Sequence, residues 1–307
     1  ESYLYGREHT LDKHNEDDLF LPNAASLRMS EVGYQSSIQD SLEISYNNLN
    51  EFVDAIVSGI KTPVKDFEDI GLFDADGVAQ QISTGILQIE NELYDIIRPK
   101  RAGPSGSRPA TLLKESGIEY LELRGIDVNP FIPEGIDANK MKLLDIYIIH
   151  SLISESPFIS RDEIEEIKVN QRVMVRNGRA KDVRLIRNGV LVPLSEIRNI
   201  YLDELEQTAK ALEEYSEGYL SAFNSEMSLD HLPSEKIMQE LESSNLSFQD
   251  YGLEQSKKIA QSFFLNGDQD FSALINAAQT SLKDLKNLQE NTGVDINKYV
   301  ELYNSKI

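Results

Sequence analysis

The chain has 307 residues, 40% of them hydrophobic and 27% charged, with a formal net charge of −22. This acidity argues against nucleic acid and anionic membranes as partners, because both need a basic surface on the protein. The absence of cysteine excludes disulfides, thiolate zinc sites and cysteine nucleophiles, and it fits a reducing compartment. With no signal peptide and no apolar run long enough to span a bilayer, we expect a soluble, cytoplasmic protein.

An amphipathic helix is predicted after a turn-rich opening of 30 residues. The stretch SLEISYNNLNEFVDAIVSGI, residues 41–60, has apolar residues at helical spacing, and Lys61-Thr62-Pro63 ends it. Its apolar face consists of Leu49, Phe52, Val53, Ile56 and Ile60. DADG at 74–77 resembles the opening of a calcium loop, but the later ligands and the closing Glu are missing, so we predict a hairpin turn.

Two later segments, residues 81–101 and 117–131, alternate between apolar and polar residues, as half-buried strands do. The second reads GIEYLELRGIDVNPF. If both strands lie in one sheet with their leucines in the core, one polar face results. It would gather Gln88, Glu90, Glu92, Tyr94, Tyr120, Glu122 and Arg124.

This polar face has two interpretations. It could simply face water, as one side of an antiparallel sheet commonly does. Alternatively, its carboxylates are hard oxygen ligands suited to Mg²⁺, and the guanidinium of Arg124 suits a phosphate. A metal held by Glu122 and by the phosphates of ATP would explain why Glu122 and Arg124 share one face. The residues therefore support a hypothetical metal–phosphate site.

A Gly/Pro/Ser loop, AGPSGSRPA, separates the two predicted strands at residues 102–110. Four cations flank it in an otherwise acidic chain: Arg98, Lys100, Arg101 and Arg108. A solvated linker is one interpretation. A loop that meets an anion such as a nucleotide phosphate is the other.

The remainder of the chain predicts mostly helices. We expect a helix near 137–154, a small β-rich patch at 173–194, and amphipathic acidic helices at 196–225, 233–244, 253–265 and 269–291. The fold class is therefore α+β: an antiparallel sheet with helices packed on one face, followed by a helical carboxy-terminal region. We place the division between a partial catalytic sheet domain, residues 1–195, and the helical region, residues 196–307.

The common catalytic motifs are missing. The sequence has no GxxxxGK[ST] loop, no strand-linked GxGxxG, no HExxH and no GxSxG. Its four histidines are scattered without ligand spacing. Chemistry in this chain would have to depend on carboxylates, arginines and tyrosines.

Three long stretches resemble one known family in both order and spacing. They are LPNAASLRMSEVGY at 21–34, QIENELYDIIRPKR at 88–101 and GIEYLELRGIDVNPF at 117–131. They closely resemble glutamate–cysteine ligases of the proteobacterial type, which catalyse the first step of glutathione biosynthesis. The resemblance implies a glutamine-synthetase-like carboxylate–amine ligase sheet. It also implies a ligase that uses ATP and Mg²⁺, with Mn²⁺ as a possible substitute.

In that family, ATP phosphorylates the γ-carboxylate of L-glutamate, and the amine of L-cysteine then attacks the acyl phosphate. By resemblance, Glu122 is similar to a metal ligand and Arg124 to the residue that contacts the transferred phosphoryl group. Arg28, Tyr34 and Tyr94 resemble residues of the cysteine pocket. Arg98 and Lys100 resemble residues that face the nucleotide.

Family members also have a long amino-terminal half with a Glu-rich metal-binding segment, and this chain starts after it. The resemblance therefore implies the carboxy-terminal portion of a ligase, with the missing half as its partner. Two alternatives stay open: a γ-glutamyl ligase that uses another amine acceptor, and a non-catalytic binding subunit of the same fold.

Overall fold

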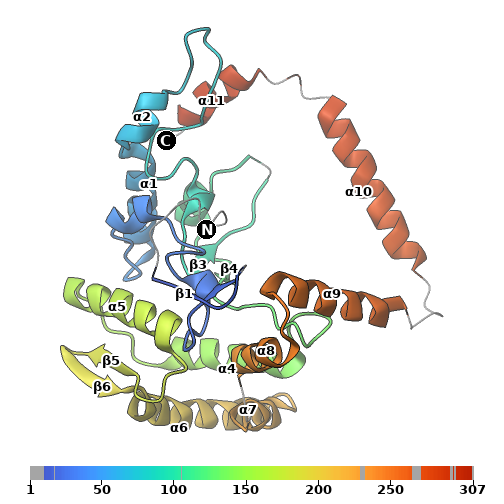
Figure 1. The fold of residues 1–307 in the computed structure, drawn as a ribbon. Coiled ribbons are helices and arrows are strands. Elements are labelled where there is room, and N and C mark those ends of the chain that lie inside the picture. The colour runs from blue at the N-terminus through green and yellow to red at the C-terminus, as the bar shows by residue number, and fades with distance from the viewer. Residues whose placement is uncertain are drawn as a thin grey trace. The chain divides into compact units, whose positions relative to one another are not determined.

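The computed structural model describes residues 10–16, 18–104, 106–228, 232–264, 271–290, 293 and 295–305 (Figure 1). These residues form helices and three two-stranded antiparallel sheets, which confirms the α+β class. The chain forms two compact units. The first comprises Glu1–Gln35 with Ile126–Phe264, and the second comprises Ser36–Gly125 with Leu265–Ile307. The division expected at residue 195 is a different grouping and remains a prediction.

The core of the second unit forms around α1, Leu49–Lys61. The Asn48 side chain caps this helix by accepting the Glu51 N–H at 2.9 Å. The predicted apolar face is buried against α3, Pro109–Ser116, and forms one core cluster. That cluster consists of Phe52, Val53, Ile56, Ile60, Leu87, Leu93, Ala110 and Leu113. The helix predicted over residues 41–60 is confirmed from Leu49 onward, whereas residues 42–48 are not helical.

The expected strand over residues 81–96 is wrong. In this segment the Ile86 N–H donates to Thr62 O at 2.9 Å and the Leu87 N–H to Gly59 O at 3.1 Å. The backbone thus pairs with the end of α1, and residues Glu90–Glu92 form a single 3-10 turn. The strand itself, β3, spans only Ile97–Lys100 and pairs with β4, Tyr120–Leu123.

The DADG segment is a turn, as predicted. Asp74 Oδ1 accepts the N–H groups of Asp76 and Val78 at 3.0 and 2.9 Å. Gly77 has φ +75°, a conformation that favours glycine. The short helix α2, Lys65–Ile70, precedes this turn. The last helix, α11, Ile296–Asn304, contacts the segment that follows the DADG turn. There Asn297 Oδ1 accepts the Ala79 N–H at 2.9 Å.

Three helices form the core of the first unit: α4 (Ala138–Ile153), α6 (Leu194–Glu213) and α7 (Tyr219–Met227). Their buried contacts are Ile146, Leu205, Ala209 and Phe223. The helix predicted over 137–154 is confirmed as α4. The helix predicted over 196–225 is two helices, because the chain turns at Gly218 with φ +94°.

The remaining elements of the first unit are short strands and peripheral helices. A hairpin of β5 (Arg184–Arg187) and β6 (Val190–Pro193) closes through Asn188 and Gly189, both at positive φ. The first half of the predicted β patch is instead the end of α5, Arg161–Asn177. The other elements are β1 (Asp12–Lys13), β2 (Leu19–Phe20), α8 (Pro233–Ser244) and α9 (Phe248–Phe264).

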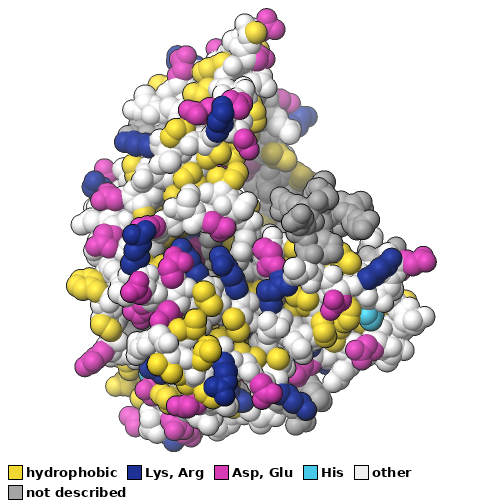
Figure 2. All heavy atoms as spheres, turned by 60° about the vertical axis from the view of Figure 1, so that its left-hand side comes forward, with side chains coloured by type: hydrophobic (Ala, Val, Ile, Leu, Met, Phe, Trp, Pro, Cys, Tyr) yellow, Lys and Arg dark blue, Asp and Glu magenta, His cyan; other side chains and the backbone are white. Residues whose placement is uncertain are grey.

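Apolar side chains reach the surface at many points, interspersed with charged ones (Figure 2). Helix α10, Ser272–Glu290, is an example, since all of its residues are exposed. Its apolar residues have the spacing of a packed helix, yet no residue of α10 is buried. None of the helices described is both long and apolar enough to cross a membrane.

Candidate functional site

The candidate site lies on the β3–β4 pair of the second unit. The strands are antiparallel, with Arg98 opposite Glu122 and Lys100 opposite Tyr120. Opposite residues share a face, so Arg98, Lys100 and Glu122 lie together. The pairing continues past β4, because the Arg124 N–H donates to Ile96 O at 2.7 Å. The polar face predicted for residues 120–124 is thus present, but only residues 97–100 of the predicted 81–101 strand form its partner.

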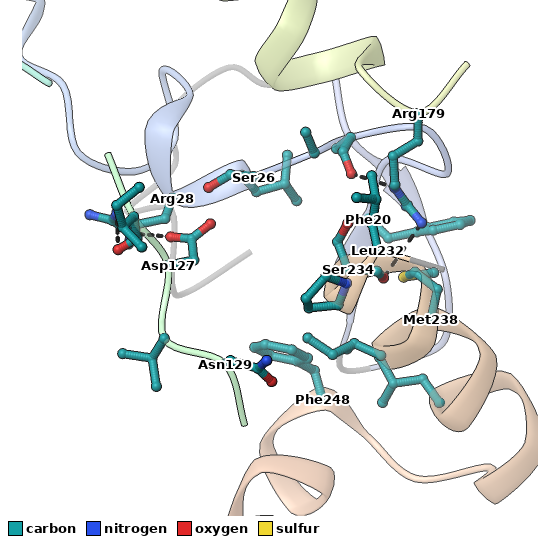
Figure 3. A pocket seen from close by; sticks show the side chains of 18 of the residues that line it. Phe20, Ser26, Arg28, Asp127, Asn129, Arg179, Leu232, Ser234, Met238 and Phe248 are labelled. Atoms are coloured by element: carbon teal, nitrogen blue, oxygen red, sulfur yellow. Dashed lines mark hydrogen bonds and ion pairs between the residues drawn. The ribbon is translucent and has the colours of Figure 1, made fainter. Parts of the chain in front are cut away.

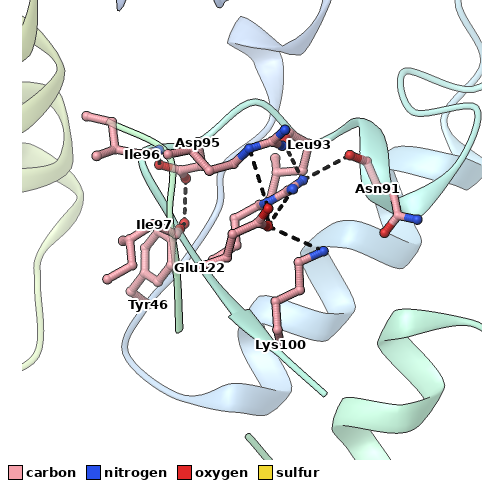
Figure 4. A network of polar contacts seen from close by, with 10 residues as sticks. Tyr46, Asn91, Leu93, Asp95, Ile96, Ile97, Lys100 and Glu122 are labelled. Carbon is pink, nitrogen blue, oxygen red and sulfur yellow. Dashed lines mark hydrogen bonds and ion pairs between the residues drawn. The ribbon is translucent and has the colours of Figure 1, made fainter. Parts of the chain in front are cut away.

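Glu122 sits among three cations (Figure 4). Arg98 donates to Glu122 Oε2 from Nε at 3.1 Å and from Nη2 at 2.7 Å. Lys100 Nζ is 3.5 Å from the same oxygen, and Arg124 Nε is 3.7 Å from Oε1. Burial raises the pKa of Glu122, but the Arg98 hydrogen bonds and the three positive charges outweigh it and lower the pKa overall. Glu122 is therefore ionised at neutral pH.

Arg98 is the anchor of this cluster. Its side chain is only 7% exposed, and its Nη1 donates to Asn91 O at 2.9 Å and to Leu93 O at 3.0 Å. Most of its donors are thus used inside the chain, where they fix the position of Glu122. Burial and the charge of Arg98 lower the pKa of Lys100, in that order of size.

These residues do not fit a metal ion unaided. No group of three or more His, Asp or Glu side chains able to hold a metal occurs among the described residues. Glu122 is one carboxylate against three cations, and those cations repel another positive ion. Any metal at Glu122 would need further oxygen ligands, such as the phosphates of ATP or carboxylates beyond this cluster.

Glu90 and Arg108, which the sequence pattern placed on the polar face and beside the 102–110 loop, pair with each other elsewhere in the second unit. Glu90, expected on the polar face, is buried and pairs with Arg108, whose Nε donates to it at 2.7 Å. Glu90 also accepts the Ala110 N–H at 2.5 Å at the start of α3, so its expected place beside Glu122 is wrong. Arg101 donates to Ser116 O at 2.7 Å. All four cations around the 102–110 loop therefore have partners within the chain.

The predicted acceptor residues belong to both units. Tyr94, in the second unit, is 43% exposed, and its N–H donates to Gln39 Oε1 at 3.0 Å. Arg28 and Tyr34, in the first unit, are held by one compact turn, in which the Tyr34 N–H donates to Arg28 O. Gly33 permits this turn, because a Cβ there would lie 2.2 Å from Arg28 O.

Arg28 has a carboxylate partner that sequence reasoning did not single out. Its Nε donates to Asp127 Oδ1 at 2.5 Å and its Nη2 to Ile126 O at 3.3 Å. Asp127 lies within the third of the motifs quoted above, but nothing in the local pattern pairs residues 99 positions apart. The pair holds the Arg28 guanidinium in place.

The same pair borders a cavity of about 970 Å³ within the first unit (Figure 3). Its walls come from residues 14–28, from the 126–140 segment, and from α8 and the start of α9. Most of the lining side chains are apolar, among them Phe20, Val128, Met238 and Phe248. A space of this size is within the range of small-molecule sites.

Comparison with known proteins now identifies the family. A family model described as glutamate-cysteine ligase matches residues 1–174. The chain belongs to the glutamate–cysteine ligase family. A curated glutamate–cysteine ligase from Alcanivorax borkumensis is 39% identical over 83% of this chain and 50% of its own length. One from Pseudomonas fluorescens is 32% identical over 99% of this chain and 59% of its own length.

A solved structure supports the same assignment. The glutamate–cysteine ligase of Francisella tularensis in complex with AMP aligns with a TM-score of 0.81 and 29% identity. The alignment covers 93% of this chain and 57% of that one. The chain thus spans between 50% and 59% of the length of these relatives.

Proposed function

We propose that this chain contributes to the ATP-dependent joining of the γ-carboxylate of L-glutamate to the amine of L-cysteine, the first step of glutathione biosynthesis. The observation that carries the proposal is the cluster of Arg98, Lys100, Glu122 and Arg124 on β3–β4. It combines an ionised carboxylate with several cations in a chain of the ligase family. A site of this composition suits a phosphoryl group that carries negative charge.

The reaction proceeds in two steps in this proposal. A γ-carboxylate oxygen of glutamate bonds to the terminal phosphorus of ATP, the bond to ADP breaks, and γ-glutamyl phosphate forms. The cysteine nitrogen then bonds to the γ-carbon, phosphate leaves, and the nitrogen loses a proton. Arg124 lies close to Glu122 and is only partly buried, so we assign it the contact with the transferred phosphoryl group.

Arg98 and Lys100 remain the proposed nucleotide-facing residues. Because Arg98 uses most of its donors on Glu122, Asn91 and Leu93, its contribution would be to hold the cluster in shape. Lys100 is the better candidate for direct contact with a phosphate. Mg²⁺ or Mn²⁺, with Glu122 as one ligand, is proposed from the resemblance alone, and no step is derived through it.

Arg28 and Tyr34 of the first unit and Tyr94 of the second remain the proposed acceptor residues, as the family resemblance implies. A guanidinium binds the carboxylate of an amino acid in a bidentate manner, and tyrosines provide an apolar wall with a hydroxyl at its edge. The cavity beside Arg28 is much larger than a cysteine side chain. This observation favours testing a second candidate function, a γ-glutamyl ligase with a larger amine acceptor.

The experiment measures γ-glutamylcysteine formation from ATP, Mg²⁺, glutamate and cysteine. This chain is assayed alone and together with the amino-terminal portion of the A. borkumensis relative, and other amines are then offered in place of cysteine. Product formed by the mixture supports the proposal. A folded mixture that forms a complex but releases no ADP with any amine would favour a non-catalytic subunit.

Arg124→Ala provides the test of the assigned residue. Removing a charge contact made in the transition state should lower kcat by about a hundredfold or more. Arg187→Ala, at an exposed arginine of β5, is the matched control and should leave kcat unchanged. If Arg124→Ala stayed within a few-fold of the parent, the phosphoryl role would have to go to another residue.

A further inference from the structure

Helix α10 has an apolar stripe that the described part of the chain leaves uncovered. On a helix with 3.6 residues per turn, its large apolar side chains fall on one side. The members of this α10 stripe are Leu274, Ile275, Leu282, Leu285 and Leu288, with Ala278 between them. The five large side chains are 52% to 68% exposed.

Such a stripe is costly to leave in water. Exposed apolar patches beyond a few hundred Å² mark interaction sites in soluble proteins. The polar side of α10 bears Lys283, Asp284, Lys286 and Glu290, so the helix has no net charge in a chain of −22. A neutral helix with one apolar stripe is suited to contact another polypeptide.

The comparisons indicate which polypeptide is available. The Francisella ligase aligns with 93% of this chain but has 43% of its own length outside the alignment, since 57% is covered. The Pseudomonas relative likewise has about two fifths of its length without a counterpart here. We propose that the α10 stripe is a docking surface for that remaining portion of the ligase, which the family resemblance places at the amino terminus.

This inference rests on the proposed function and adds the surface through which the two portions associate. A second copy of this chain is the competing occupant. The two occupants differ in stoichiometry, so a measurement of mass separates them.

The test is copurification of this chain with the amino-terminal portion of the A. borkumensis relative, without ATP or substrates. Ile275→Asp with Leu282→Asp places two charges in the stripe, seven residues apart. The control, Asn276→Asp with Lys283→Asp, places two Asp residues at the same spacing on the polar side and adds more negative charge. Because α10 has no buried residue in this chain, neither variant should unfold it, which circular dichroism verifies.

We expect the unsubstituted chain to form a one-to-one complex, and the stripe variant to bind at least tenfold more weakly. The control should bind within about threefold of the parent. Equal binding by the stripe variant, or no complex with the unsubstituted chain, would overturn the inference. So would a chain that forms a dimer on its own through α10, since the occupant would then be a second copy.

The two proposals can fail separately. A complex that depends on the α10 stripe but forms no γ-glutamylcysteine retains the docking surface and refutes the proposed function. If the stripe variant binds and supports activity as well as the unsubstituted chain does, the proposed function is retained and the docking surface is refuted.

Discussion

When Asp95 is ionised, the Tyr46 hydroxyl has two oxygen acceptors and only one hydrogen to donate. Tyr46 Oη lies 2.5 Å from Asp95 Oδ2 and 2.9 Å from Ile97 O, yet the hydroxyl has a single hydrogen to donate. A protonated Asp95 donates to Tyr46 and leaves that hydrogen for Ile97 O. Burial is the main cause that raises the pKa of Asp95, and burial followed by the charge of Asp95 raises the pKa of Tyr46.

This raised pKa predicts a dependence of stability on pH. The stabilisation is complete below the pKa of an unfolded Asp, about 3.9, and is lost as pH rises through the higher folded pKa. Asp95→Asn has no charge to gain, so its unfolding free energy should improve relative to the parent as pH rises from about 4 to about 7. Urea unfolding across that range measures the difference. Asp69→Asn, at an exposed pair with Lys65, is the control. If the unfolding free energies of Asp95→Asn and the parent differed by the same amount at every pH, the prediction would be contradicted.

Asp127 is expected to position Arg28 for the acceptor. Both side chains are over two fifths exposed, so their ion pair should add little to stability. Without Asp127 the guanidinium loses its fixed orientation. In the complemented assay, Asp127→Ala should therefore raise KM for cysteine by about fivefold, or about 1 kcal/mol, with kcat within about twofold.

The control for that measurement is Asp182→Ala, at an exposed turn of the same unit. Equal KM values for Asp127→Ala and the parent would show that Arg28 keeps its orientation without the carboxylate. A fall in kcat with KM unchanged would place Asp127 in the chemistry of the transition state instead.

At the scale of elements, Arg108 joins three parts of the second unit. It pairs with Glu90, whose side chain is 1% exposed, and Glu90 in turn binds the first turn of α3. The Arg108 guanidinium also lies 4.7 Å from the centre of the Tyr303 ring on α11, and Arg108 Nη1 donates to Tyr303 O at 3.2 Å. Three segments distant in sequence thus depend on one side chain.

Arg108→Ala should lower the unfolding free energy by about 3–5 kcal/mol, because it leaves a buried carboxylate without its cation. Adding Glu90→Gln to that variant should restore part of the loss. Arg101→Ala, at a more exposed arginine, should cost about 1 kcal/mol or less. Denaturant unfolding of the parent, the two single arginine variants and the double variant measures these free energies. Equal losses for Arg108→Ala and Arg101→Ala would be inconsistent with a buried pair.

Elements governed by local patterns were predictable, and those governed by distant partners were not. The faces of α1 and the bounds of α4 follow from helical spacing and from capping side chains close in sequence. The polar face of β4 follows from strict alternation over residues 120–123. Residues 81–96 alternate equally well, but the N–H groups of Ile86 and Leu87 bond to the end of α1, and an alternating sequence pattern does not encode that partner.

The candidate site divides in the same way. Glu122 and Arg124 share a face because they are two positions apart in one strand. Arg98 came from the family resemblance as a nucleotide residue, but its pairing with Glu122 depends on the register of β3 and β4. The partners of Arg28 and Arg108 likewise depend on contacts between distant segments.

At the scale of the whole molecule, two opposed features govern how the chain behaves alone. Its net charge of −22 makes copies repel one another at low salt. Large apolar side chains are nevertheless exposed in both units, among them Leu152, Phe158 and Leu288. The range of the repulsion shrinks with salt, from about 30 Å at 0.01 M to about 3 Å at 1 M, whereas apolar contact does not weaken.

We therefore expect the isolated chain to self-associate more as salt is added. Light scattering at about 0.05 M and about 0.5 M NaCl should report a larger mean mass at the higher concentration. Adding the amino-terminal portion of a relative should reduce this association, because it covers apolar surface. Ion pairing between copies would give the opposite trend, with mass falling as salt rises. A monodisperse monomer at both concentrations would mean that the exposed side chains are too dispersed to form a contact, and would weaken the case for a missing partner.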